Sequence, residues 1–150
     1  MGLLDIFKWG LRNQSEHLSI YSNNEELYNA ALSLWNSLEI ASFYAIVALI
    51  VIGLLLPCFY YYVYNKWPGR KYSIQHWILW LVITLFLTIV VNIFLGRIIV
   101  TSTLKEKLEF IWNISIISGI YAILMYLVVS IIICNSPVPT NAYRFLKIGK

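Results

Sequence analysis

The chain has 150 residues, of which 60% are hydrophobic and 12% are charged. A soluble domain carries about 25% charged residues because its surface must be hydrated. Asp, Glu, Lys and Arg are absent from residues 40–65, 72–96 and 110–143, and a soluble globular fold does not leave such gaps. About 20 apolar residues in a helix cross a hydrocarbon core about 30 Å thick. The sequence therefore predicts an all-α integral membrane protein with three transmembrane helices.

Amphipathic helices are expected in the N-terminal region, residues 1–37. Within residues 1–12, one face carries Leu3, Leu4, Phe7 and Leu11. Such a segment either lies in the headgroup region or docks on the protein itself. Residues 13–24 are polar and are predicted as a loop. A second amphipathic helix begins at Asn24, whose side chain can cap it. Since no Gly or Pro follows, this helix is expected to continue into the first span.

The predicted transmembrane region covers residues 38–134, with spans at about 38–64, 73–95 and 108–134. Pro57 removes one backbone donor from the first span, so a kink or a loosened turn is expected there. An aromatic cluster after Pro57 is typical of the headgroup level. Pro137 and Pro139 end the third span. Residues 135–150 remain as a basic C-terminal tail.

Charge distribution predicts the orientation of the chain. The first connection and the tail together hold six Lys and Arg and no acid, whereas the N-terminal side holds five basic and seven acidic residues. Loops rich in Lys and Arg stay in the cytoplasm. We therefore expect the N-terminus outside and the C-terminus in the cytoplasm. The Ile-, Asn-, Tyr- and Lys-rich composition is compatible with an AT-rich bacterium, and hence with a bacterial inner membrane.

Recognisable catalytic and metal-binding patterns are missing from the sequence. It has no HExxH, GxSxG or Gly-rich phosphate loop, and its two cysteines, Cys58 and Cys134, do not form a CxxC pair. His17 is expected in a loop, and His76 is interpreted as a polar residue at a helix start. The prediction is a non-enzymatic protein without catalytic residues, a cofactor, a metal ion or a nucleic-acid partner.

A polar stripe is expected along the second span, where Thr84, Thr88, Asn92 and Gly96 recur every four residues. The stripe either packs against another helix or lines a wet path shared by several copies. Packing is favoured, because a Thr hydroxyl can bond to a carbonyl of its own helix. Asn92 cannot do so easily and is the stronger signal.

Small residues on the third span form two small-xxx-small pairs, Ser115 with Gly119 and Ser118 with Ala122. Such pairs let two helix backbones approach closely. Three spans have limited capacity to bury all these polar and small faces among themselves. We therefore expect the protein to associate with itself or with other membrane proteins.

Two functions are compatible with these features. The first is a non-catalytic polytopic membrane subunit that oligomerises, or that anchors or assembles a larger membrane complex. Its contacts with lipid or a partner would be made by basic residues near the ends of the chain, namely Lys8, Arg12, Arg144, Lys147 and Lys150. The alternative is a homo-oligomeric ion channel or permeabilising pore, such as a toxin or a defence effector. The three-span layout with a basic cytoplasmic tail resembles one class of phage holins, which implies a pore.

Overall fold

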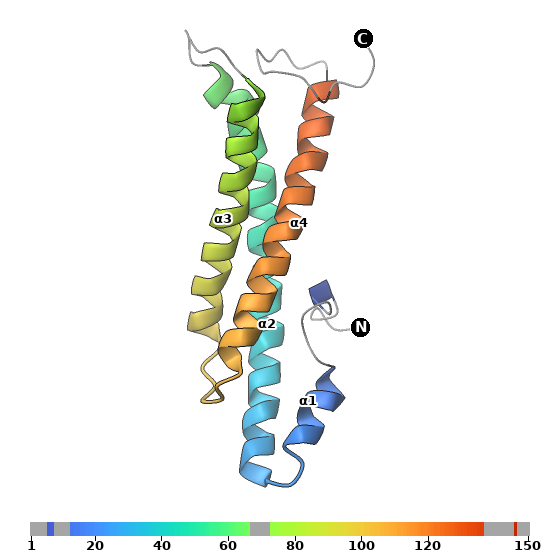
Figure 1. Cartoon of the computed structure of the whole chain (residues 1–150), viewed down its shortest axis with the longest axis vertical. Helices are drawn as coiled ribbons and strands as arrows, with labels where there is room; N and C mark the ends of the chain where they lie inside the picture. Colours follow the sequence, from blue (N-terminus) through green and yellow to red (C-terminus); the bar gives the residue numbers. More distant parts are fainter. Residues whose placement is uncertain (1–5, 8–12, 67–72, 137–145, 147–150) are drawn as a thin grey trace. The chain divides into compact units, whose positions relative to one another are not determined.

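The computed structural model describes residues 6–7, 13–66, 73–136 and 146, and the described part is helical without strands. Its elements are α1 (Gln14–Ile20), α2 (Glu25–Tyr62), the short 3-10 helix η2 (Tyr64–Lys66), α3 (Ile74–Ile99) and α4 (Lys107–Asn135) (Figure 1). The all-helical fold class is therefore confirmed. The predicted helix over residues 1–12 lies outside the described residues, except for Ile6 and Phe7.

The chain forms two compact units, each assembled from separate stretches of sequence. Unit 1 comprises Met1–Ala48 and Ile89–Ser118, and unit 2 comprises Leu49–Thr88 and Gly119–Lys150. Helices α2, α3 and α4 each contribute residues to both units. Each unit has its own buried hydrophobic cluster.

The polar segment before α2 is helical over Gln14–Ile20, so the prediction of a loop over residues 13–24 is wrong for these seven residues. α1 has seven residues, and its side chains are mostly exposed; His17 is fully buried and Leu18 is half-buried. A helix this short needs only one or two inward side chains to dock on a neighbour. It therefore lacks the apolar periodicity by which a sequence signals a helix. In unit 1, α1 lies beside the first turns of α2 (Figure 1).

The start of α2 was predicted correctly from its capping residue. The Asn24 side-chain oxygen accepts bonds from the backbone N–H groups of Glu26 and Leu27, at 3.0 and 3.2 Å. These bonds satisfy two of the donors that a helix N-terminus leaves open. The helix then continues without a break from Glu25 to Tyr62, through Pro57.

Three of the helices, α2, α3 and α4, are long and apolar enough to cross a membrane. α3 and α4 begin and end within four residues of the predicted spans, and α4 ends at Asn135, just before the predicted Pro-rich stop. The structure ends α3 at Ile99 and begins α4 at Lys107.

Unit 1 has an aliphatic and aromatic core. Leu34, Trp35 and Leu38 of α2 pack in one buried cluster with residues from the start of α4 and from the connection before it; these are Val100, Phe110, Ile111 and Ile114. Phe7 joins the same cluster. The N-terminal half of α2, the start of α4 and the α3–α4 connection are thus held together in this unit.

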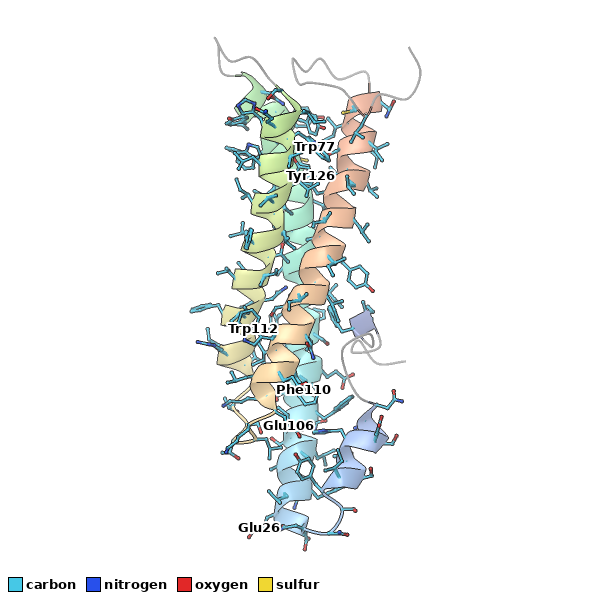
Figure 2. The ribbon with its side chains drawn as sticks, viewed as in Figure 1. Glu26, Trp77, Glu106, Phe110, Trp112 and Tyr126 are labelled. Carbon is cyan, nitrogen blue, oxygen red and sulfur yellow. The ribbon has the colours of Figure 1, made fainter. Side chains whose placement is uncertain are left out.

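Unit 2 has a core rich in aromatic side chains. Tyr60, Tyr61, Trp77 and Tyr126 are all buried there. The rings of Trp77 and Tyr126 meet edge to face with centroids 5.6 Å apart (Figure 2), an arrangement that aromatic pairs favour.

Candidate functional site

The polar stripe predicted on α3 is buried along its length. Thr84, Thr88, Asn92 and Gly96 are all buried. The Thr84 hydroxyl donates to the Trp80 carbonyl, and the Thr88 hydroxyl donates to the Thr84 carbonyl, each at 2.8 Å. Both hydroxyls are therefore satisfied on their own helix, as Thr side chains in apolar helices often are.

Asn92 makes a different contact, which joins three helices of unit 1. Its amide nitrogen donates to the Ser118 hydroxyl on α4 at 2.7 Å, and that hydroxyl donates to the Ala45 carbonyl on α2 at 3.4 Å. Ser118 is fully buried and Asn92 is 4% exposed. We call Ala45, Asn92 and Ser118 the polar junction. Through it, the Asn92 amide is hydrogen-bonded to α4 and, by way of Ser118, connected to α2.

Gly96 lies one turn beyond Asn92 and permits close approach between α3 and α4. A Cβ atom at Gly96 would lie 2.8 Å from Cγ2 of Ile111, closer than atoms pack. The absence of a side chain at this position therefore sets how closely the two helices pack in unit 1, as the small-residue rule for membrane helices predicts.

The small residues predicted on α4 are all buried. These are Ser115, Ser118, Gly119 and Ala122. The Ser115 hydroxyl donates to the Ile111 carbonyl on its own helix at 2.7 Å. In unit 2, a Cβ atom at Gly53 of α2 would lie 3.0 Å from the Met125 side chain and 3.6 Å from the Ala122 carbonyl oxygen. Gly53 was not predicted from the sequence, although a lone Gly within an apolar span is a signal for close packing.

Two further polar contacts in unit 2 were not expected from the sequence. The Trp77 indole N–H donates to the Ser130 hydroxyl at 3.3 Å, and the Cys134 thiol donates to the Tyr61 hydroxyl at 3.3 Å. Trp77 is only 6% exposed. These contacts pair polar atoms of α4 with α2 and α3 inside an aromatic core.

The two histidines differ in their surroundings. His76 accepts or donates at Nδ1 with the Ser73 hydroxyl, 3.0 Å away, as expected for a polar residue at a helix start. His17 is fully buried in unit 1, with its Nδ1 3.5 Å from a carboxylate oxygen of Glu106. Among the described residues, no group of three or more His, Cys, Asp or Glu is placed to hold a metal ion.

Several charged residues near the ends of the long helices are exposed, although Glu106 and Lys107 are half-buried. Glu39, Arg97 and Glu109 are all exposed. The basic residues predicted to contact membrane or partner, Lys8, Arg12, Arg144, Lys147 and Lys150, lie outside the described residues.

The outward surfaces of α3 and α4 carry rows of large apolar side chains. On α3 the row is Phe86, Val90, Phe94 and Ile98, each about 60% exposed or more. On α4 it is Trp112, Ile116, Ile120, Leu124, Val128 and Ile132. Both rows recur every four residues. α3 thus presents polar and small residues inward and bulky apolar residues outward.

No family model, curated protein or solved structure matches this chain.

Proposed function

We propose that the chain crosses a bilayer three times and serves as a non-catalytic subunit that oligomerises, or that anchors or assembles a larger membrane complex. The observation that carries the proposal is the two-sided pattern of α3. Its polar and small residues are buried within the chain, whereas Phe86, Val90 and Phe94 point outward. In water such a surface is unfavourable, because each exposed large apolar side chain costs about 1.5–3 kcal/mol relative to burial. In lipid the cost disappears.

A second protein on this surface is supported by the uneven burial of the helices. In its most apolar 18-residue stretch, α3 is 17% buried, compared with 28% for α2 and 39% for α4. α3 therefore offers the largest uncovered share for a neighbouring membrane helix. Bulky aliphatic and aromatic residues pack there by van der Waals contact, which contributes to association between helices in lipid.

The homo-oligomeric pore is the second candidate. A pore needs polar side chains that face a shared water-filled path. Asn92 supports this candidate only to the extent that it is a buried amide whose oxygen has no hydrogen-bond partner. Burial of Thr84 and Thr88, and the bond from Asn92 to Ser118, instead support a packing role for the stripe.

Both candidates are tested on one purified sample of the full-length chain. Mass photometry in a mild detergent gives the copy number and reveals co-purified proteins, and planar-bilayer recording detects conductance. The subunit proposal predicts a defined oligomer or complex and an electrically silent bilayer. Discrete conductance steps that disappear in Asn92→Leu, with the oligomer intact, would instead establish the pore. A silent monomer without bound protein would contradict both candidates.

A further inference from the structure

His17 anchors α1 in unit 1 through an aromatic surround. Its ring centroid lies 5.4 Å from that of Phe110 on α4, 6.1 Å from that of Trp35 on α2 and 5.6 Å from that of Tyr21 just after α1. The side chain is fully buried, while most other side chains of α1 are exposed. The attachment of α1 therefore depends strongly on this one ionisable residue.

Glu106 supplies the charge that faces this ring. One of its carboxylate oxygens lies 3.5 Å from Nδ1 of His17, and this oxygen is buried although the side chain as a whole is 35% exposed. Glu106 immediately precedes α4, and Figure 2 shows it close to Phe110. A buried carboxylate oxygen is stable only next to a donor, preferably a positively charged one.

The other charged groups on the elements around His17 face elsewhere in the described residues. On α1 Glu16 is exposed, and on α2 Glu25, Glu26 and Glu39 are exposed. At the start of α4, Lys105 and Glu109 are exposed, and the Lys107 ammonium donates to the Ser102 carbonyl at 2.7 Å. The Glu106 carboxylate is thus a charged group in contact with the His17 ring.

We propose that His17 and Glu106 form a pH-dependent contact that holds α1 on unit 1 while the imidazole is protonated and weakens when the proton is lost. A charged imidazole neutralises the buried oxygen of Glu106. After deprotonation, the carboxylate oxygen remains buried and negative without a positive neighbour. This inference concerns the docking of α1 and does not depend on the proposed function.

The sign of the pH dependence follows from which group is charged. The contact is strongest where the His17 imidazole is protonated and faces the Glu106 carboxylate. Docking weakens as the pH rises through the titration of the imidazole. Its loss uncovers Trp35 and Phe110, which are buried in the docked form.

Hydrogen–deuterium exchange of the full-length chain in nanodiscs tests this contact. Amides of Gln14–Ile20 should be protected at about pH 5.5. Their protection factors should fall about tenfold at about pH 8, after correction for the intrinsic pH dependence of exchange. Exchange in α3 and α4 should change little, which separates release of α1 from unfolding. Wild-type protection that is independent of pH would overturn the proposal.

Two variants and a matched control complete the test. His17→Gln should leave α1 weakly protected at both pH values, and Glu106→Gln should remove the extra protection at the lower pH. His76→Gln changes the other histidine and should retain the wild-type difference. If either His17→Gln or Glu106→Gln keeps the full pH difference while α3 and α4 remain protected, the His17–Glu106 contact is not its source.

Discussion

Single polar side chains within the long helices contribute to the contacts between helices only when their hydrogen bonds reach another helix. The Thr84 and Thr88 hydroxyls donate to their own helix, so they add little to the contact between helices. The Asn92 amide donates to Ser118 on another helix, and Ser118 in turn reaches Ala45 on a third. In an apolar environment, the second kind of bond helps to fix how the helices pack. The polar junction is therefore the place where a single substitution should reveal coupling.

A double-mutant cycle of Asn92→Ala and Ser118→Ala measures that coupling. Interhelical side-chain bonds in membranes contribute about 0.6 kcal/mol on average and up to about 1.7 kcal/mol, so a coupling energy in this range is expected in the free energy of unfolding. Unfolding by SDS in mixed micelles provides the measurement. The control cycle pairs Asn92→Ala with Ser115→Ala, whose hydroxyl bonds within α4. Equal coupling in both cycles would contradict the junction.

Gly96→Ala tests the close approach of α3 and α4. The new Cβ would lie 2.8 Å from Cγ2 of Ile111, and Ile in a helix cannot easily change χ1 to avoid it. Overpacking lowers the free energy of unfolding by about 1–3 kcal/mol, whereas the higher helix propensity of Ala raises it by about 1 kcal/mol. A lower Tm in detergent is therefore expected. Ile111→Ala should destabilise the Gly96→Ala protein less than the wild type. A Tm that rises with Gly96→Ala alone would contradict this packing.

Whole helices show which local signals the sequence carries and which it lacks. The Asn24 cap and the apolar length of α2, α3 and α4 predicted these elements, because both signals are local. α1 was missed because it docks through little more than one residue, His17. The α3 stripe was predicted from its four-residue spacing. Its pairing with Ser118 was not, because the rotation and register of one helix against another are set by tertiary packing.

The two faces of α3 can be distinguished by placing tryptophan on each. Val90→Trp adds bulk to the outward row and should leave folding intact, whereas Thr88→Trp adds it to a fully buried position and should abolish a monodisperse protein. Fluorescence-detected size-exclusion chromatography measures both. If a partner helix covers the outward row, Val90→Trp will release it while the chain stays folded. Equal tolerance of the two substitutions would contradict the assignment of the faces.

At the scale of the whole molecule, the distribution of charge follows the two units. All seven acidic residues belong to unit 1, and unit 2 contains six Lys and Arg without any Asp or Glu. The order of residues in the sequence predicted this asymmetry, because charge can be counted along the chain without knowledge of contacts. The division into units was not predictable in the same way, since it cuts across each long helix and arises from packing.

The charge asymmetry predicts a single orientation in the proposed membrane. Lys66, Arg70 and Lys71 lie between the first two long helices, and three more basic residues follow the third. Basic loops resist translocation. In a bacterial host, a C-terminal green fluorescent protein should therefore fluoresce, and a C-terminal alkaline phosphatase, which needs the oxidising periplasm, should be inactive.

Charge reversal in the first connection shows whether these residues cause the orientation. Changing Lys66, Arg70 and Lys71 to Glu removes the basic residues nearest the ends of α2 and α3, so part of the population should invert and gain phosphatase activity. Changing Lys105 and Lys107 to Glu removes charge from the opposite connection and should leave the wild-type pattern, because it increases the existing difference. Phosphatase activity in the unmodified chain would place the basic tail outside and show that another feature determines how the helices insert.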